Sequence, residues 1–315
     1  MINLNSKIYI AGHTGLIGSA ILRRLKELKY KNLIYKNRNQ LDLKNQLKVY
    51  NFLKRNKPDA VIIAAALVGG IKANNQYKAD FIFDNLSIQN NLIHGSYISG
   101  VKNLIFLGSS CVYPKNSKIP IKEKYLLSGF LEETNEPYAI AKIAGIKLCS
   151  SYNYQYKVNY KSLMPCNSYG KNDNYNLQTS HFIPALIKKI YKAKKNNKKS
   201  IEIWGNGKPL REVIYSDDIA DACIFFLKKR TKETLINIGT GTDKSIKDYA
   251  KIIMKKFDVK LKISYKNRKL NGTFRKLLDV SLAKKYGWRS KISFSKGIIY
   301  AINDFLKKYN NTNSK

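Results

Sequence analysis

The chain has 315 residues, and its 58 lysines and arginines against 21 acidic residues give a formal net charge of +37. A chain of this length can bury about 75% of its unfolded surface, which suffices for one large or two modest domains. The basic residues are spread along the whole sequence instead of forming a tail or a stripe, so we interpret the charge as a compositional bias that also attracts small phosphorylated ligands, and we expect no nucleic-acid partner.

The cysteines and histidines form no recognisable metal or disulfide pattern. Four isolated cysteines and three histidines are present, and no pair of cysteines has the C-x-x-C spacing of zinc sites. No apolar run approaches the ~18 residues that span a membrane. The short polar segment 1–6 lacks the character of a signal peptide. We therefore expect a cytoplasmic protein with no metal and no membrane partner.

The first expected strand is followed by a glycine-rich turn. Residues 7–11, Lys-Ile-Tyr-Ile-Ala, have the pattern of a buried strand and precede Gly-His-Thr-Gly-Leu-Ile-Gly, after which residues 19–28 have a helical pattern. Glycine at every third position lets the backbone turn tightly and approach a pyrophosphate, whose charge the helix N-terminus stabilises. The segment predicts a dinucleotide site, although a plain strand-to-helix turn would have the same pattern. The residues of this site are Gly12, His13, Thr14, Gly15, Leu16, Ile17 and Gly18.

The second expected strand, 32–35, ends in two cations. Lys36 and Arg38 stand where an NAD enzyme would usually carry an acidic residue for the ribose 2′-hydroxyl. Cations at this place favour a 2′-phosphate, so NADP(H) is the expected cofactor. Asp42 and Leu43 fall where the adenine would lie; for Asp42 the alternative is the N-cap of an expected helix over 45–54.

The pattern then alternates between strands and helices. Residues 59–66 form a near-continuous apolar run of the kind that parallel sheets bury on both faces, and the small side chains of Ala65 and Ala66 leave room for a flat cofactor at the strand end. A helix over 81–98 and a strand over 103–107 follow. This alternation predicts an α/β fold with a Rossmann-type, doubly wound parallel sheet, whose ligands lie at the carboxyl ends of the strands.

A serine, a tyrosine and a lysine follow the fourth strand. Ser109 comes soon after it, and Tyr138 and Lys142 share one face of an expected helix that ends near residue 154. A neighbouring cation favours a phenolate, so we expect Lys142 to lower the pKa of Tyr138 from its reference of about 10. These groups could pass a proton to a carbonyl oxygen as hydride reaches the carbon. The same Tyr-x-x-x-Lys spacing occurs elsewhere in the chain, where it indicates only a solvated helix face.

The second half of the chain has a mixed α+β pattern. A strand end breaks into a loop at Pro165, and a helix opens near Phe182 and runs to about residue 193. Strands are then expected over 201–204, 235–238 and 261–265, and helices over 217–227 and 245–257. We expect residues 1–170 to form an NADP-binding Rossmann domain, with some later segments returning to it, and residues 171–315 to form mainly a smaller substrate-binding lobe.

Several segments together resemble one known family. They are the turn at 12–18, Val-Gly-Gly-Ile at 68–71, Gly-Ser-Ser-Cys-Val-Tyr-Pro at 108–114, the unbroken run Asn-Glu-Pro-Tyr-Ala-Ile-Ala-Lys-Ile-Ala-Gly-Ile-Lys-Leu-Cys at 135–149, Ser-His at 180–181, and the segment from Trp204 to Glu212. The sequence is similar over nearly its whole length to the GDP-L-fucose synthases, which are extended short-chain dehydrogenase/reductases. The resemblance implies an NADPH-dependent enzyme that epimerises GDP-4-keto-6-deoxy-D-mannose at C3 and C5 and then reduces C4 to give GDP-L-fucose.

The resemblance also implies the catalytic roles. A C4 ketone acidifies the hydrogens on C3 and C5, so inversion needs one group that removes a proton and one that returns a proton from the opposite face. The family's base and acid fall on Cys111 and His181. Ser109 and Tyr138 would hold O4 as an enolate forms; Tyr138 would then protonate O4, and Lys142 would tune Tyr138 and bind the nicotinamide ribose. Taken alone, Cys111 would be a small buried hydrophobic residue and His181 a neighbour of a helix N-cap.

The remaining contacts follow from the same resemblance. The nucleotide sugar is expected at Lys189, Trp204, Arg211, Asn271 and Lys276. Arg211 could fork onto the diphosphate, and Trp204 could stack on a ring or be a core aromatic. Further cofactor contacts are expected at Leu107, Gly108, Ser110, Pro165, Asn167 and His181. The family also implies a homodimer formed through the helices over 81–98 and 138–154.

Some positions depart from the family pattern. Thr14 replaces a basic residue for the 2′-phosphate, which leaves that contact to Lys36 and Arg38, and Phe182 beside the expected acid could reshape the sugar pocket. The alternative function is therefore that of a reductase or epimerase-reductase for a related GDP-4-keto sugar, such as a 3,6-dideoxyhexose or a heptose. A more distant alternative is a basic nucleic-acid-binding protein that keeps the fold without catalysis, against which the intact catalytic residues argue.

Overall fold

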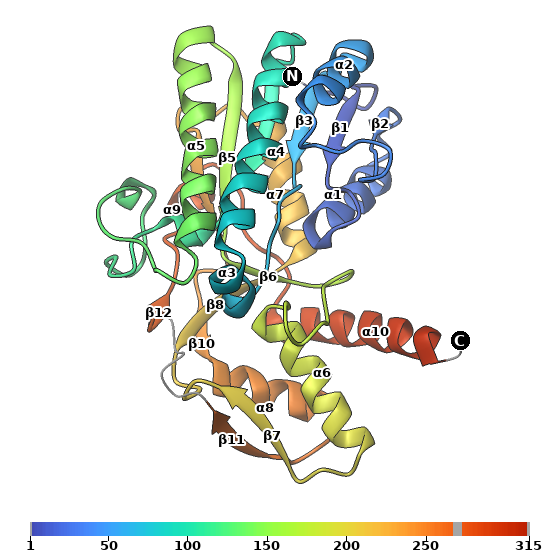
Figure 1. The fold of residues 1–315 in the computed structure, drawn as a ribbon, viewed down its shortest axis with the longest axis vertical. Coiled ribbons are helices and arrows are strands. Elements are labelled where there is room, and N and C mark those ends of the chain that lie inside the picture. Colours follow the sequence, from blue (N-terminus) through green and yellow to red (C-terminus); the bar gives the residue numbers. More distant parts are fainter. Residues whose placement is uncertain (1, 267–272, 314–315) are drawn as a thin grey trace.

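The structure is a computed structural model that describes residues 2–266 and 273–313. Its larger sheet has six strands, all parallel (Figure 1). In spatial order they are β2 (Leu33–Ile34), β1 (Ile8–Ala11), β3 (Ala60–Ile63), β4 (Asn103–Leu107), β5 (Asn159–Pro165) and β9 (Leu235–Ile238). The inner strands are almost wholly buried apolar runs, as a sheet covered on both faces requires. The predicted Rossmann-type, doubly wound parallel sheet is confirmed.

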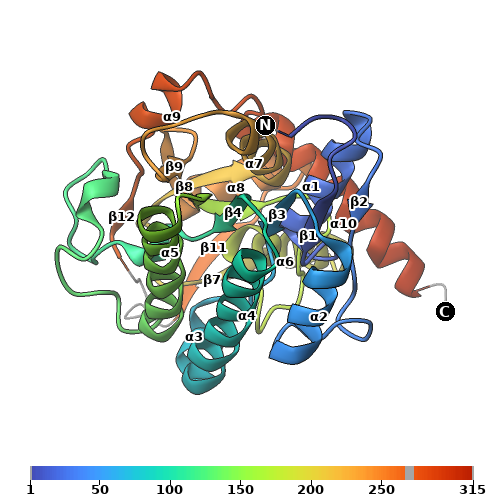
Figure 2. The ribbon, with the colours of Figure 1, turned by 90° about the horizontal axis from the view of Figure 1, so that it is seen from above.

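Helices cover both faces of this sheet, as Figure 2 shows from above. On one face α4 (Lys78–Ile98) packs against α5 (Glu136–Tyr156) and α2 (Gln46–Asn56), while on the other α1 (Leu16–Glu27) packs against α7 (Ser216–Lys228). The short α3 (Ile71–Gln76) precedes α4, and α9 (Ser281–Lys285) lies beside β9. Two 3₁₀ turns, η1 (Ser110–Val112) and η2 (Glu123–Tyr125), lie in the long connection from β4 to α5.

The order of the strands reverses at β1. The chain moves from β1 outward to β2 and then returns to place β3 on the other side of β1. In open α/β sheets, ligands bind where the order reverses, beyond the carboxyl ends of the strands. The glycine-rich turn follows β1 and the paired alanines follow β3, so both segments stand at this reversal.

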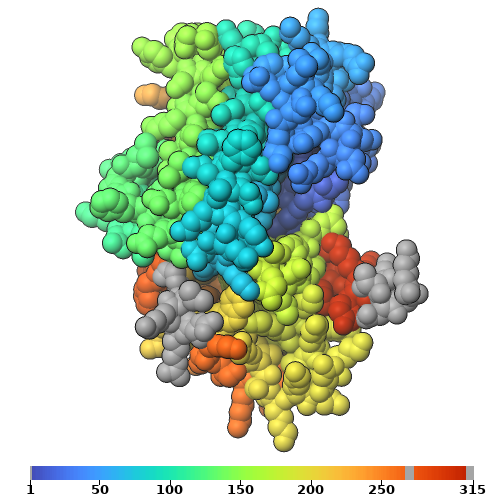
Figure 3. Space-filling view, viewed as in Figure 1, coloured from blue at the N-terminus to red at the C-terminus, as the bar shows by residue number. Residues whose placement is uncertain are grey.

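The second half of the chain builds a separate hydrophobic core. The part of the molecule around this core is the yellow and orange lower mass in Figure 3. β8 (Leu210–Tyr215) pairs with β6 (Asn167–Tyr169), β10 (Asp243–Ser245) and β12 (Arg275–Lys276), and β7 (Ser200–Trp204) pairs with β11 (Lys262–Lys266). The helices are α6 (Phe182–Lys195), α8 (Ile246–Lys256) and α10 (Phe294–Asn313). α6 forms because apolar residues recur three and four apart, at Ile183, Leu186, Ile187 and Ile190, and all four are buried in this core.

The two cores do not divide the sequence at a single point. Side chains from residues 214–238 and 278–288 belong to the first core, together with those of the amino-terminal half. The strand β9 therefore completes a sheet whose other strands end at residue 165. Figure 1 shows the chain crossing between the two parts at β6, at α7 and again near β12.

A buried carboxylate ties these crossings together. Oε1 of Glu212 on β8 accepts hydrogen bonds from the N–H groups of Thr240 and Gly241 at 2.6 and 2.7 Å, and Oε2 accepts from the N–H of Leu278 at 2.9 Å. Glu212 is fully buried, and this burial raises its pKa while the hydrogen bonds act in the opposite direction. One side chain thus joins the second core to two segments that return to the first.

The sequence analysis does not predict β6, β8, β10 or β12. β6, β10 and β12 have only two or three residues each, and β8, which has six, contains the charged residues Arg211 and Glu212, of which glutamate is depleted in strands. The expected helix over 19–28 begins earlier, at Leu16, because the last glycine of the turn, Gly18, is itself helical.

Candidate active site

The turn between β1 and α1 leaves no room for a side chain at Gly12 or Gly18. Gly12 has φ +86°, and a Cβ at this position would lie 2.6 Å from the backbone nitrogen of Ala65. A Cβ on Gly18 would collide with the carbonyl oxygen of Gly12. α1 begins after Gly15, with no acidic residue in its first turn, so its positive end is not neutralised there. This cradle fits the pyrophosphate of a dinucleotide.

The two cations beyond β2 stand where the sequence analysis expects them. Lys36 and Arg38 are both exposed. Beside them the imidazole of His13 packs against the ring of Tyr35 with centroids 4.8 Å apart, and burial lowers the pKa of His13. Neutral rings next to two exposed cations fit a phosphorylated ribose, because the cations can pair with the 2′-phosphate.

The segment after β3 is held by an asparagine that the sequence analysis misses. The N–H of Leu67 donates to Oδ1 of Asn85 at 2.9 Å, and Nδ2 of Asn85 donates to the carbonyl oxygens of Leu67 and Phe81 at 3.0 and 2.7 Å. Ala65 and Ala66 are half-buried in this segment, next to the glycine-rich turn. The only signal for Asn85 in the sequence is its polar side chain on the buried face of an expected helix.

Tyr138 and Lys142 lie one turn apart in α5, where aromatic rings surround them. Nζ of Lys142 lies 5.8 Å from the centroid of the Tyr138 ring and 4.8 Å from that of Phe106, and it donates to the carbonyl oxygen of Leu107 at 2.8 Å. The ring of Phe81 meets the Tyr138 ring edge-on, with centroids 6.3 Å apart. The packing fixes both polar groups at the carboxyl end of β4.

The expected direction of the Tyr138 pKa is wrong. Burial and the nearby Cys111 raise the pKa of Tyr138 well above its ordinary value, and a hydrogen bond with Ser109 opposes them only in part. Burial also lowers the pKa of Lys142 to about 7, so this lysine loses most of its charge above neutral pH. Tyr138 therefore keeps its proton, which suits a proton donor better than a base.

The buried lysine predicts a pH-dependent stability. Below about pH 7 Lys142 is charged in both the folded and the unfolded chain, and the whole cost of burying its ammonium lowers the stability of the fold. Between pH 7 and 10.5 the unfolded chain binds more protons than the folded chain, so the stability of the fold rises with pH. Lys142→Met should remove this cost. We expect the change in melting temperature, variant minus parent, to be more positive at about pH 6 than at about pH 9 in scanning fluorimetry without cofactor. Lys147→Met, exposed on the same helix, is the control, and an equal change at both pH values would contradict the prediction.

Ser109 and Cys111 lie beside Tyr138 at the start of η1. The N–H of Cys111 donates to Oγ of Ser109 at 3.2 Å. Nδ2 of Asn135 and Nζ of Lys276 approach Sγ of Cys111 at 3.5 and 3.8 Å. Cys111 is half-buried, whereas the other three cysteines are buried. The structure thus brings the three expected catalytic groups together and adds Asn135, whose only signal in the sequence is its place three residues before Tyr138.

His181 stands at the start of α6 and makes no side-chain capping hydrogen bond there. The backbone before it packs on a glycine pair: the N–H of Gly70 donates to the carbonyl oxygen of Thr179 at 2.9 Å, and a Cβ on Gly70 would lie 2.7 Å from that of Ser180. Burial lowers the pKa of His181, so the protonated imidazole gives up its proton more readily than an ordinary histidine does.

Two of the expected substrate residues meet on the surface of the second core. Nζ of Lys189 lies 5.3 Å from the centroid of the Trp204 ring and donates to the carbonyl oxygen of Glu202 at 2.9 Å. Trp204 is 38% exposed, so it is not the core aromatic that the sequence left open. An exposed indole beside a cation can receive a ring and an anionic group together.

The other expected substrate residues lie on neighbouring strands. Arg211 of β8 is the register partner of Lys276 of β12, and Nη1 of Arg211 donates to the carbonyl oxygen of Leu210 at 2.8 Å. Burial lowers the pKa of Arg211, whereas the nearby Cys111 and Glu132 act in the opposite direction and offset this only in part. Lys276 faces Cys111, as described above. Asn271 lies outside the described residues.

The remaining expected cofactor residues stand at strand ends or in the connection from β2 to α2. Leu107 ends β4, Gly108 and Ser110 follow it, Pro165 ends β5, and Asn167 opens β6; because β4 and β5 are parallel neighbours, their carboxyl ends lie together. Asp42 and Leu43 are half-buried. The side chain of Asn45, and not that of Asp42, caps α2 by accepting from the N–H of Lys48, so the capping alternative for Asp42 is wrong.

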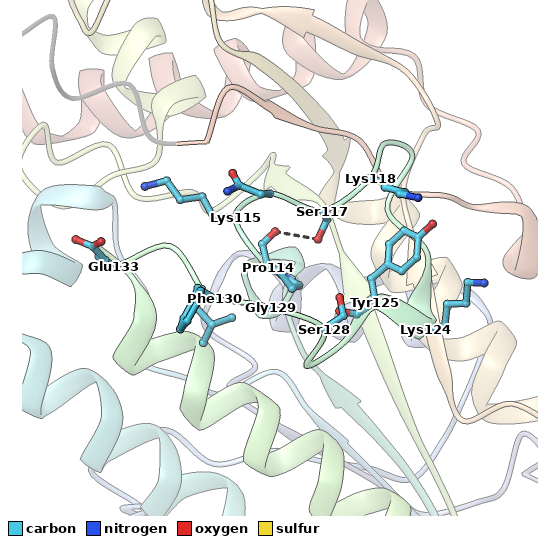
Figure 4. A pocket seen from close by; sticks show the side chains of 12 residues that line it. Pro114, Lys115, Ser117, Lys118, Lys124, Tyr125, Ser128, Gly129, Phe130 and Glu133 are labelled. Carbon is cyan, nitrogen blue, oxygen red and sulfur yellow. Dashed lines mark hydrogen bonds between the residues drawn. The ribbon is translucent and has the colours of Figure 1, made fainter.

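A surface cavity of about 720 Å³ opens within the loop that joins η1 to α5 (Figure 4). Its lining includes Lys115, Lys118 and Lys124 together with the rings of Tyr125 and Phe130. None of its lining residues is an expected site residue, so the chemistry predicted from the sequence lies elsewhere, around Cys111 and Tyr138.

Groups of metal ligands and membrane-spanning helices are absent from residues 2–266 and 273–313. Within these ranges no three histidine, cysteine or acidic side chains come together as metal ligands would. No described helix is both long enough and apolar enough to span a membrane.

The chain is similar over most of its length to characterised proteins. The NAD dependent epimerase/dehydratase family matches residues 8–239. GDP-L-fucose synthase 1 of Arabidopsis thaliana is 46% identical over 98% of this chain and 95% of its own, and GDP-L-fucose synthase of Escherichia coli is 44% identical over 96% and 97%. The structure of a GDP-mannoheptose C4 reductase from Campylobacter jejuni with NADP bound superposes with a TM-score of 0.89 and 40% identity, covering 97% of this chain and 100% of that one.

Proposed function

The chain belongs to the GDP-L-fucose synthases within the NAD dependent epimerase/dehydratase family, and from this premise we propose that it converts GDP-4-keto-6-deoxy-D-mannose to GDP-L-fucose by epimerisation at C3 and C5 and NADPH-dependent reduction at C4. The observation that carries the proposal is the group of Ser109, Cys111 and Tyr138 at the end of β4, in which Tyr138 keeps its proton.

In the epimerisation, Cys111 and His181 act on opposite faces of the sugar. Cys111 takes the proton from C3 or C5: the C–H bond breaks, an S–H bond forms, and the electron pair moves onto O4. Ser109 and Tyr138 donate hydrogen bonds to O4 as its charge develops, which lowers the barrier because the donors are already in place. The protonated imidazole of His181 then returns a proton from the other face.

In the reduction, Tyr138 donates its proton to O4. When bound, NADPH supplies the hydride that reduces C4. The raised pKa of Tyr138 keeps the phenol protonated until negative charge forms on O4. The carbonyl of Leu107 and the ring of Phe106 hold Lys142 beside this phenol.

We assign the cofactor to the first sheet and the nucleotide sugar to the second core. The glycine-rich turn would hold the pyrophosphate and Lys36 and Arg38 the 2′-phosphate. Lys189 and Trp204 would hold part of the nucleotide sugar and Arg211 its diphosphate. This division follows the proposed domains, 1–170 with returning segments and 171–315.

The cation pair predicts the choice between cofactors. Replacing Lys36 or Arg38 by Glu should raise the KM for NADPH about tenfold or more, because a charge-assisted hydrogen bond to the 2′-phosphate contributes about 1.5–3 kcal/mol. The KM for NADH, which lacks that phosphate, should change little. Lys31→Glu, exposed at the other end of β2, is the control for a general loss of positive charge. Equal losses with both cofactors would contradict the assignment of the pair.

We further propose a homodimer that forms through α4 and α5. The support is the exposure of apolar side chains on these helices, among them Phe83 at 66%, Ile140 at 42% and Tyr154 at 83%, because such surfaces commonly mark interfaces. Sedimentation or light scattering of the purified protein would test it, and a monomer at micromolar concentration would contradict it.

We also propose a cytoplasmic location, which cell fractionation would test.

Turnover in deuterated water tests the proposed reaction directly. The enzyme is incubated with GDP-4-keto-6-deoxy-D-mannose and NADPH in D₂O, and the product is analysed by NMR. Deuterium at both C3 and C5 of GDP-L-fucose is the expected result. A reduced product without deuterium at either carbon would contradict the epimerase activity and leave a C4 reductase.

A related GDP-4-keto sugar is the second candidate. Phe182 follows His181 directly and packs against Tyr249 with centroids 5.7 Å apart, which places a bulky ring at the start of α6. The similarity to a GDP-mannoheptose C4 reductase also favours it. Parallel assays with 4-keto derivatives of a GDP-linked heptose and a 3,6-dideoxyhexose would decide between them through kcat/KM.

A further inference from the structure

The sulfur of Cys111 lies between two donors that come from different parts of the chain. Nδ2 of Asn135, at the start of α5, lies 3.5 Å from Sγ, and Nζ of Lys276, on β12, lies 3.8 Å from it. The two contacts differ in kind, because one donor is a neutral amide and the other an ammonium. Lys276 is thereby directed at the thiol, a role apart from the nucleotide-sugar contact that the family resemblance implies.

The amide of Asn135 is available to the thiol because it does not cap its own helix. Asn135 is the N-cap residue of α5, where an asparagine would normally accept a hydrogen bond from the first turn, yet its side chain makes no such bond. Oδ1 of Asn135 is buried and has no hydrogen-bond partner within the part of the chain that the structure describes. The side chain of Asn135 therefore contacts Cys111 instead of capping α5.

The cations that act on Cys111 come from two elements. Lys276 on β12 faces the sulfur directly. Arg211 on β8 interacts with Cys111, and the carboxylate of the buried Glu132 interacts with Arg211 in turn. Tyr138 on α5 is neutral because its pKa is raised. The two cations near the sulfur are therefore Lys276 and Arg211, and Lys276 makes the direct contact.

We propose that Lys276 and Asn135 are positioning residues for Cys111, which hold its sulfur as a thiolate aimed at the sugar. The inference rests on the proposed function, in which Cys111 removes a proton from C3 or C5. The ammonium of Lys276 stabilises the thiolate charge, and the amide of Asn135 fixes the direction of the sulfur. Neither residue forms a bond to the reacting carbons.

Alkylation of Cys111 by iodoacetamide tests this without turnover. The reagent is uncharged, so nearby cations do not steer it, and only the thiolate reacts. The rate of Cys111 labelling is followed by mass spectrometry of the full-length protein over a pH series. Lys276→Gln should slow labelling near pH 7 about tenfold and move the rate profile to higher pH, because a cation within about 4 Å of an acid favours its ionised form by about one pH unit or more.

Two variants provide matched controls. Lys276→Arg keeps the charge and should label at close to the parent rate. Arg275→Gln removes a charge one residue away, where the side chain pairs with Asp243 and is 42% exposed, and it should also label normally. An unchanged Cys111 rate in Lys276→Gln, or an equal loss in Arg275→Gln, would overturn the proposal.

The labelling of the buried cysteines shows whether a variant is folded, and a second variant tests the proposal if Lys276→Gln is not. The buried Cys149, Cys166 and Cys223 react only if the fold opens, so their labelling reports on each variant. If they react in Lys276→Gln, Asn135→Asp decides: a carboxylate in place of the amide should slow Cys111 labelling more than tenfold near pH 7, and an unchanged rate would overturn the proposal. Failure of the proposed function gives a different result, namely wild-type product without deuterium while the labelling rates still respond to Lys276.

Discussion

Tyr138→Phe is expected to reduce the 4-keto sugar about 10²–10⁴ times more slowly than the parent enzyme, the range over which a positioned proton donor usually acts. The hydroxyl group is the only part of the side chain removed, and its burial holds the proton at the place where O4 gains charge. The ring and its edge-on contact with Phe81 remain, so the fold should be retained. The measurement is the kcat for NADPH oxidation with saturating substrate.

A tyrosine on the same helix provides the control for this variant. Tyr154 is 83% exposed, and Tyr154→Phe should reduce the sugar at the parent rate. If Tyr138→Phe kept a kcat within a few-fold of the parent, another donor would have to protonate O4, and the proposed role of Tyr138 would be wrong.

Cys111→Ser is expected to suppress proton exchange at C3 and C5 about 10²-fold or more while reduction is affected less, because a serine hydroxyl is a far weaker base than a thiolate. Exchange is measured by NMR as deuterium incorporation into the 4-keto sugar in D₂O without NADPH. Reduction is measured separately as NADPH oxidation. The two readouts separate the base from the donor, since Tyr138→Phe should mainly affect the second.

Cys111→Ala controls for any residual basicity of the serine hydroxyl, and it should exchange no faster than Cys111→Ser. Equal losses of exchange and reduction in Cys111→Ser and Tyr138→Phe would contradict the division of roles between the two residues. The side chain of Cys111 is half-buried, so both replacements should leave the fold intact.

The cofactor half could be predicted closely from the sequence because its signals are local. Gly12 and Gly18 stand where any side chain would clash, and the strand at 103–107 is a continuous apolar run that the structure reproduces at both ends. Such patterns depend on neighbours within a few residues. They identify the sheet, its order of elements and the turn that would hold a pyrophosphate.

The arrangement around Cys111 could not be predicted in the same way. Its contact with Lys276 spans 165 residues, and Lys276 belongs to a two-residue strand that no periodicity reveals. The pKa of Tyr138 shows a different limit: the spacing to Lys142 suggests a lowered value, but burial, which spacing does not reveal, decides the direction. Long-range contacts and desolvation thus set the chemistry of residues that the motif only locates.

The position of β9 in the sheet has a consequence for how the protein is made. Ribosomes deliver the chain from its amino end, and the sixth strand, Leu235–Ile238, emerges only after β7 and β8 of the other core. The nascent nucleotide-binding sheet therefore keeps β5 as an open edge until β7 and β8 of the other core have been made, and this half is completed only after part of the second one.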